Sequence, residues 1–145
     1  MFKHILIPTD GSALSTMAVQ KAMHLARDAG AKVTVVTVVE PFHVFSMDSV
    51  QIADTRSAYE KHARQAAERY LAEARQQADS LGVPCEAIQI EQDLPYKAIT
   101  DTAVAKGCDL IAMASHGRRG AAALILGSET AKVLTHSSIP VLVFR

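Results

Sequence analysis

Short apolar runs alternate with longer segments of helical period along the whole chain. Most of the runs are rich in Val, Ile and Leu and are bounded by Gly, Pro or Asp, which is typical of β-strands. They cover residues 5–7, 33–39, 85–91, 109–113 and 141–144. The run at 85–91 partly alternates apolar with polar residues, as expected for a half-exposed edge strand. The runs at 5–7 and 109–113 are continuous, as in strands buried on both faces.

Four segments with helical spacing separate these runs. The first begins after Ser12, a good N-cap residue, and ends at Gly30. Its predicted inward positions are Leu14, Ala18, Ala22, Leu25 and Ala29. Two shorter helices are predicted at about 95–106 and from Ser128, which we expect to be the N-cap of the last helix.

The longest helical pattern covers about residues 57–81 and ends before Gly82 and Pro84. One side of it carries Tyr59, Ala63, Ala66, Ala67, Tyr70, Ala74, Ala78 and Leu81. Its charged residues lie largely off that side, as on a solvated helix face. The preceding stretch, 41–55, has no clean period, so we expect a loop or lid partly packed on the body.

Five strands alternating with four helices predict a doubly wound parallel α/β sheet, because right-handed crossovers place helices on both faces. The order 3-2-1-4-5 puts the half-polar third strand at one edge and strands one and four side by side at a topological switch point. Residues 8–10 and 113–117 would then face one another across a crevice. We expect one Rossmann-like domain over 1–145.

Composition narrows the class of protein further. The 15 basic and 15 acidic residues cancel, and no basic block is present, which argues against nucleic acid or an anionic membrane as a partner. Cys85 and Cys108 form no CxxC pair and no cluster at metal spacing, so reduced thiols, a cytoplasmic location and no protein-bound metal site are expected. No apolar run approaches the length of a membrane helix.

The chemistry-bearing stretch is 113–130, where a strand leads into a glycine-bearing loop and the loop into a helix N-terminus. Glycines allow close backbone approach, and free N–H groups at a helix start attract phosphate. Arg118 and Arg119 could add charge-assisted contacts. The alternative is that Gly117 and Gly120 only turn the chain and that Ser128 only caps the helix.

The spacing Ala114-x2-Gly117-x9-Gly127-Ser128 resembles the nucleotide-binding motif of the universal stress protein family, Gly-x2-Gly-x9-Gly-(Ser/Thr). Ala114 departs from that motif, because the family's ATP-binding members commonly have glycine there. Residues 3–12 and 137–143 also resemble the family's opening and closing strands. The resemblance covers essentially the whole chain and implies a fold similar to the adenine nucleotide alpha hydrolases.

The resemblance to ATP-binding members also implies a set of ligand contacts. Adenine and ribose would lie against Pro8, Thr9, Asp10 and Val38. Phosphates would lie along Met113, Ala114, Gly117, Arg118, Gly127, Ser128, Glu129 and Thr130. A structural or phosphate-contacting role is expected for His116 rather than general-base catalysis. The alternatives are that Thr9 and Asp10 only form a turn and that Val38 is a core residue.

The sequence thus favours a stress-response regulatory protein that binds ATP, ADP or AMP, with Mg or Mn carried only by the phosphates. No Walker A lysine motif is present, so hydrolysis is expected to be slow at most and no catalytic residue is assigned. Gly127→Val is expected to abolish binding while leaving the fold largely intact.

Two alternatives come from other classes of function. One is a nucleotide-free dimeric interaction protein of the same family, supported by Ala114. The other is a nucleotidyl transferase using residues 115–117, which lacks a second histidine because Arg118 follows Gly117. Whichever function holds, the apolar last strand, with Val141, Leu142, Val143 and Phe144, is an unprotected edge that invites a homodimer.

Overall fold

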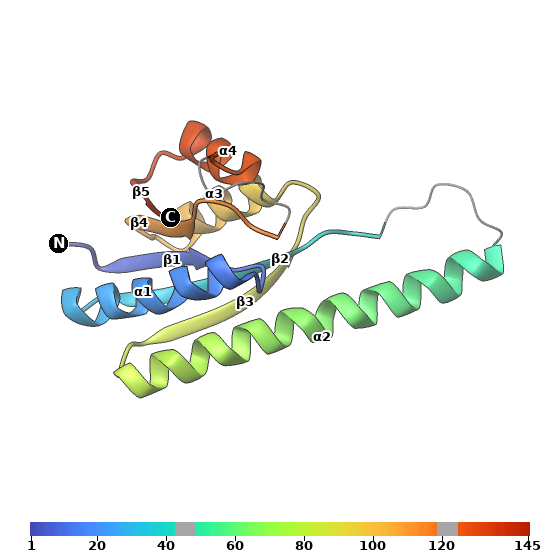
Figure 1. The fold of residues 1–145 in the computed structure, drawn as a ribbon, viewed down its shortest axis with the longest axis horizontal. Coiled ribbons are helices and arrows are strands. Elements are labelled where there is room, and N and C mark those ends of the chain that lie inside the picture. The colour runs from blue at the N-terminus through green and yellow to red at the C-terminus, as the bar shows by residue number, and fades with distance from the viewer. Residues whose placement is uncertain (43–48, 119–124) are drawn as a thin grey trace.

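The computed structural model describes residues 1–42, 49–118 and 125–145, with the backbone alone at 49–52. In this part of the chain five parallel strands form one sheet in the order β3-β2-β1-β4-β5, as predicted (Figure 1). The elements are β1 (His4–Pro8), α1 (Ala13–Ala29), β2 (Lys32–Val39), α2 (Ser49–Leu81), β3 (Cys85–Glu91), α3 (Pro95–Ala105), β4 (Leu110–Ala114), α4 (Ser128–His136) and β5 (Val141–Phe144).

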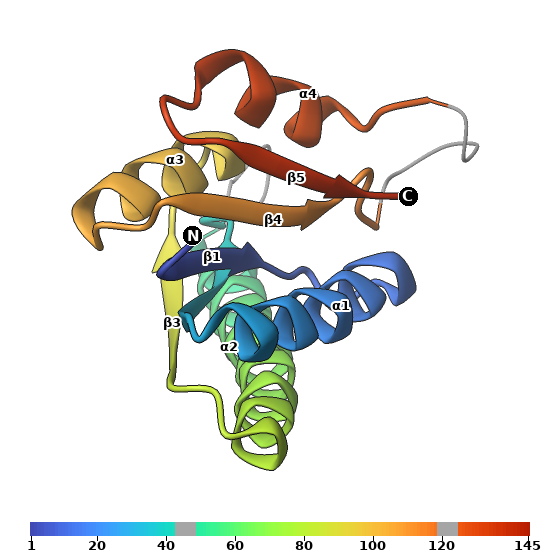
Figure 2. The ribbon, with the colours of Figure 1, turned by 90° about the vertical axis from the view of Figure 1, so that its left-hand side faces the viewer.

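The central strand β1 explains why its run is continuously apolar. It pairs with both β2 and β4, and Ile5 lies opposite Val33 on one side and Leu110 on the other. Ile5 and Ile7 pack with α1 and α2, whereas Leu6 packs with α3 and α4 on the other face. The two helix pairs therefore cover opposite faces of the sheet (Figure 2), and each face has its own core.

Helix α1 begins and ends where the capping residues predict. The Ser12 hydroxyl accepts a hydrogen bond from the Ser15 amide at 3.2 Å, and Gly30 closes the helix at φ 67°. The buried face consists of Ser15, Ala18, Val19, Ala22, Met23 and Ala26. The predicted inward positions Ala18 and Ala22 are confirmed, but Ala29 is exposed. The buried face includes Val19, Met23 and Ala26, so it is turned slightly around the helix from the predicted face and leaves Ala29 outside it.

Helix α2 begins at Ser49, eight residues before the predicted start at residue 57, so much of the predicted loop at 41–55 is helix. Residues 43–48 of that predicted loop or lid lie outside the described part of the chain. Between residues 53 and 65 the side chains are mostly exposed, and Figure 1 shows this end of α2 extending beyond the sheet. A helix without a buried face has no apolar period, which is why the pattern missed its start.

Candidate functional site

The turn after β1 lies at the carboxyl edge of the sheet, beside the end of β4. The Thr9 amide donates to the Val36 carbonyl at 2.9 Å, and the Thr37 hydroxyl donates to the Thr9 carbonyl at 3.1 Å. Within the turn, the Thr9 hydroxyl accepts from the Gly11 amide at 3.3 Å. Thr9 is 7% exposed, so it holds the turn on β2 and offers a ligand mainly its backbone.

The Asp10 carboxylate of this turn accepts hydrogen bonds on both of its oxygens. Its Oδ1 accepts from the Ser12 amide at 3.0 Å and from the Ser15 hydroxyl at 2.9 Å, and its Oδ2 accepts from the Arg118 amide at 2.8 Å. Burial opposes ionisation, but the hydrogen bonds from Ser12, Arg118 and Ser15 outweigh it and lower the pKa of Asp10. The Asx turn weighed as an alternative is therefore present, and it holds an ionised carboxylate at the switch point.

Gly117 lies directly against that carboxylate. A Cβ atom on Gly117 would be 2.3 Å from Asp10 Oδ2, so only glycine allows this approach. Two predicted site segments that are more than a hundred positions apart in sequence thus meet at Asp10, as the strand order required.

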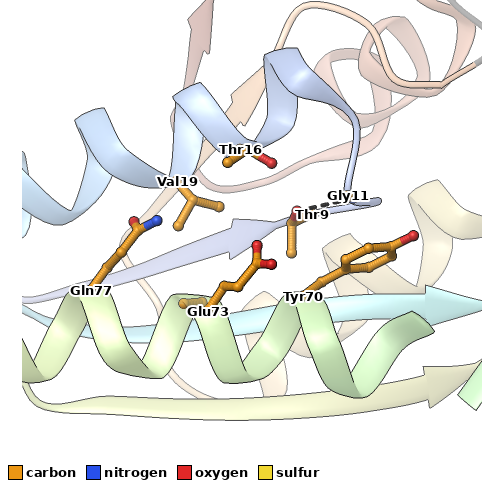
Figure 3. Close-up of a pocket in the computed structure, with 8 residues that line it drawn as sticks. Thr9, Gly11, Thr16, Val19, Tyr70, Glu73 and Gln77 are labelled. Atoms are coloured by element: carbon orange, nitrogen blue, oxygen red, sulfur yellow. Dashed lines mark hydrogen bonds between the residues drawn. The ribbon is translucent and has the colours of Figure 1, made fainter. Parts of the chain in front are cut away.

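The Arg118 side chain also reaches the turn and continues to α2. Its guanidinium donates to the Asp10 carbonyl and to the Tyr70 hydroxyl, and it lies 5.6 Å from the centre of the Tyr70 ring. The Tyr70 ring in turn packs against Gly11, as Figure 3 shows. The sequence placed Tyr70 only on the inward stripe of its helix. Its hydroxyl-bearing ring among the mostly alanine residues of that stripe was the one sequence signal that Tyr70 contacts a residue outside its own helix. Arg119 and Gly120 lie outside the described residues.

The end of β4 and the start of α4 are joined by two hydrogen bonds to backbone carbonyls. The Thr130 hydroxyl donates to the Ala114 carbonyl at 2.9 Å, and the Gly127 amide donates to the Ser115 carbonyl at 2.8 Å. Met113 and Ala114 are each 6% exposed and Thr130 is 3% exposed. Their side chains therefore belong to the body of the protein.

Two predictions about the start of α4 need correction. The N-cap is Gly127, at φ −63° and ψ 152°, and Ser128 is the first helical residue rather than the cap. A Cβ on Gly127 would lie 2.9 Å from the His116 Cα atom. Gly127 is thus required by the packing of the loop itself, and Gly127→Val would disturb the loop as well as any ligand.

Glu129 lies in the first turn of α4, but its carboxylate points to another helix. Oε2 accepts from the Tyr96 amide at 2.9 Å at the start of α3, and Oε1 lies 3.3 Å from Lys132 Nζ. The N-cap of α3 is Leu94, whose side chain has no acceptor atom, so Glu129 caps α3 from outside it. Only the backbone of Glu129 is left to contact a ligand at α4.

The remaining predicted residues lie around this edge. Pro8 ends β1 and is half-buried. His116 is half-buried, with Nδ1 3.3 Å from the Ser115 hydroxyl. Val38 is half-buried at the end of β2 and packs with Ile88 and Ile90 on the core beneath α3 and α4, so the core role weighed for it is real.

Within 1–42, 49–118 and 125–145, no three His, Cys, Asp or Glu side chains are grouped so that they could hold a metal ion. Among the described helices, none is long and apolar enough to cross a membrane.

The family model described as the universal stress protein family matches residues 1–145. The chain belongs to this family. A universal stress protein of Thermus aquaticus is 32% identical over 100% of both chains. The hypothetical protein MJ0577 of Methanocaldococcus jannaschii is 24% identical in sequence, and its structure gives a TM-score of 0.80 over 99% of this chain and 95% of that one.

Two other solved family structures contain nucleotides. A universal stress protein in complex with cAMP is 24% identical, with a TM-score of 0.73 over 99% of this chain and 97% of that one. An Arabidopsis thaliana family protein with AMP bound is 15% identical, with a TM-score of 0.65 over 98% and 90%. At these identities the universal stress protein fold is what the three structures and this chain share.

Proposed function

We propose that this universal stress protein is a stress-response regulator of the ATP-binding type, which takes ATP, ADP or AMP in the crevice between β1 and β4. The observation that carries the proposal is the ionised Asp10 carboxylate, which joins the turn after β1 to the loop that leads to α4. The cAMP and AMP complexes of relatives support an adenine nucleotide as the ligand class.

Each part of the crevice has a chemical role in this proposal. Asp10 would accept hydrogen bonds from ribose hydroxyls, while Pro8, Thr9 and Val38 would flank the sugar and base. Gly127 and Ser128 begin α4, and the N–H groups of a first helical turn have no acceptor within the helix, so they suit phosphate oxygens. Arg118 would supply the charge, and Mg or Mn would be carried by the phosphates.

The nucleotide-free reading rests mainly on Ala114. This residue is 6% exposed, so its methyl group has little surface with which to crowd a phosphate, and this supports the nucleotide-binding proposal. We infer slow hydrolysis at most, because the chain has no Walker A lysine motif. The protein would then act through what its nucleotide-bound state contacts rather than through turnover.

The test is calorimetric titration of the nucleotide-stripped protein with ATP, ADP and AMP, with and without magnesium. Asp10→Asn should weaken binding about tenfold or more, since it replaces a charged acceptor of ribose hydroxyls. Asp28→Asn makes the same charge change at an exposed position near the end of α1 and should leave affinity unchanged. Equal affinity in both variants, or no binding by the wild type, would refute the proposed site.

We also infer a homodimer through β5 and a cytoplasmic location. Leu142 is 37% exposed on this edge strand, although β5 is apolar from Val141 to Phe144.

Cys85 and Cys108 are free thiols, and burial raises the pKa of Cys108 to about 11. Unpaired, protonated thiols suit a reducing compartment.

A further inference from the structure

The Arg118 side chain already occupies part of the proposed site and is anchored to α2. We propose that Arg118 exchanges between Tyr70 and the phosphates of a bound nucleotide, so that Tyr70 sets how strongly the site prefers phosphorylated ligands over nucleosides. The inference rests on the proposed nucleotide function and adds a positioning residue, Tyr70, that lies on α2 outside the loop.

The first step is competition at Asp10. Its two oxygens already accept three hydrogen bonds, two at Oδ1 and one, from the Arg118 amide, at Oδ2. A carboxylate has about four acceptor positions, so little capacity is left. A ribose hydroxyl that binds Oδ2 must share it with the Arg118 amide or displace it, and every adenosine-containing ligand meets this cost.

The second step concerns the guanidinium, and here ligands differ. It donates to the Tyr70 hydroxyl and the Asp10 carbonyl, both neutral oxygens, and lies 5.6 Å from the centre of the Tyr70 ring. Arg118 is exposed, so these contacts are weak enough to exchange. Phosphate oxygens are charged and match the planar fork of arginine. A phosphorylated ligand can therefore draw the guanidinium away, whereas a nucleoside offers it no better acceptor.

The third step is that the half-buried Tyr70 ring lies close against the turn and has little room to move inward. A Cβ on Gly11 would lie 2.2 Å from the Tyr70 ring, which shows how closely the ring covers that backbone. Behind it, between α1 and α2, is a cavity of about 10 Å³ bordered by Thr16, Val19 and Ala74 (Figure 3). That is room for about one water molecule and not for an aromatic ring.

The experiment measures dissociation constants for ATP and adenosine in four proteins and compares the adenosine-to-ATP ratio. Tyr70→Phe keeps the ring but removes the hydroxyl acceptor, so ATP should bind roughly three- to tenfold more tightly while adenosine changes less, and the ratio should rise. Arg118→Ala removes the group that phosphate attracts, so the ratio should fall below that of the wild type. Opposite signs from two neighbouring variants are not expected of a purely structural contact.

Tyr59→Phe is the matched control, because Tyr59 is also on α2 but its hydroxyl donates to the Glu40 carbonyl at 3.0 Å. It should leave the ratio unchanged, and thermal melting should show all four proteins folded. An unchanged or lowered ratio in Tyr70→Phe would overturn the exchange while leaving nucleotide binding intact. A wild type that binds neither ligand would instead refute the proposed function.

Discussion

Gly11 combines two constraints at the turn that supports Asp10. Its φ of +77° is a left-handed conformation, and the Tyr70 ring fills the space that a Cβ would need. Gly30 has a similar φ of +67°, but nothing lies within 4 Å of its would-be Cβ. Substitution at Gly30 therefore tests the backbone conformation alone, whereas substitution at Gly11 tests the same conformation together with close packing against Tyr70.

We predict that Gly11→Ala lowers the free energy of unfolding by about 2–4 kcal/mol, whereas Gly30→Ala lowers it by about 1 kcal/mol. The difference is the displacement of Tyr70, which only the first variant requires. Urea denaturation of the two variants beside the wild type measures both losses. Equal losses would mean that the ring moves aside without cost.

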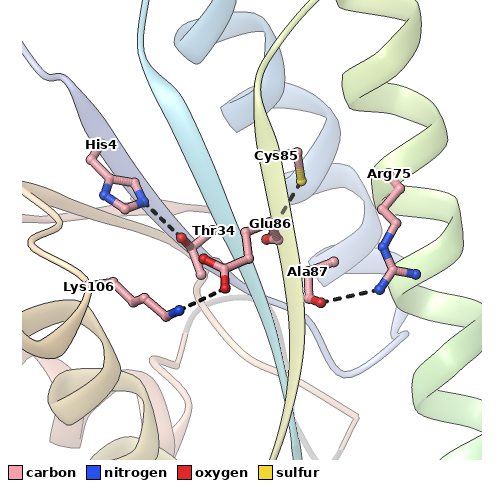
Figure 4. A network of polar contacts seen from close by, with 7 residues as sticks. All are labelled: His4, Thr34, Arg75, Cys85, Glu86, Ala87 and Lys106. Atoms are coloured by element: carbon pink, nitrogen blue, oxygen red, sulfur yellow. Dashed lines mark hydrogen bonds and ion pairs between the residues drawn. The ribbon is translucent and has the colours of Figure 1, made fainter.

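His4 is a titratable group at the start of β1, at the opposite, amino edge of the sheet, and it lies beside Thr34 (Figure 4). It is 7% exposed, and its Nε2 lies 2.8 Å from the Thr34 hydroxyl. Burial is the larger cause that lowers the pKa of His4, and the charge of Lys32 lowers it further. These two effects outweigh a hydrogen bond with the Lys106 backbone and the negative charges of Asp109 and Glu86, which raise the pKa. The folded state therefore keeps this imidazole neutral where the unfolded chain would protonate it.

We predict that His4 makes the protein less stable in mild acid. The unfolded chain begins to bind this proton below its ordinary pKa of 6.5, while the folded state resists, so stability falls as the pH drops through 6.5 toward the lower folded value. His4→Gln keeps a polar partner for Thr34 and should not show that part of the loss. Urea denaturation between pH 8 and pH 5 measures it, and parallel curves for the two proteins would contradict the prediction.

At the scale of elements, α3 and α4 are linked by a cap that neither helix contains alone. Glu129 on α4 accepts from the Tyr96 amide in the first turn of α3. A carboxylate at that position also suits the positive end of the α3 dipole. Helix α3 therefore depends on α4 for one of its N-terminal contacts.

We predict that Glu129→Ala lowers the free energy of unfolding by about 1 kcal/mol, as loss of a helix cap does. Lys132→Ala removes an exposed amine that lies 3.3 Å from Glu129 Oε1 and 5.7 Å from the centre of the Tyr96 ring, and it should change stability by less than about 0.5 kcal/mol. Guanidinium denaturation distinguishes the two. Equal effects would mean that the ion pair, and not the cap, is what matters.

At the scale of the whole molecule, the sheet ends in two edges of different character. Strand β3 partly alternates apolar with charged or polar residues, and Glu86 pairs with Lys106 at 2.7 Å. Strand β5 carries no charge between Val141 and Phe144. Charged edges discourage pairing and apolar edges permit it, so β5 is the edge where a second copy is expected.

We predict that Leu142→Lys converts the proposed β5 dimer into a monomer, because the lysine charge would be buried against the second copy. Val104→Lys places the same charge at a residue that is 61% exposed on α3 and should leave the dimer unchanged. Sedimentation velocity measures the mass of each. A dimer that survives Leu142→Lys would exclude β5 as the interface.

The sequence by itself determined the elements and their order in space. Runs such as 5–7, caps such as Ser12 and Gly30, and the half-polar edge strand are encoded within a few neighbouring residues, so local reasoning finds them. Parallel topology then followed from the alternation of strands and helices. The sheet order β3-β2-β1-β4-β5 is the confirmed result.

Only the tertiary structure decided which side chains meet at the carboxyl edge. Asp10 and Arg118 are 108 positions apart, and no local sequence pattern predicts that the Arg118 amide donates a hydrogen bond to the Asp10 carboxylate. Glu129 was expected along the phosphates, and only the tertiary structure shows that its carboxylate caps α3, because the distance between two helices sets the partner of that side chain. The start of α2 was missed for the converse reason: beyond the sheet no packing imposes an apolar period on its sequence.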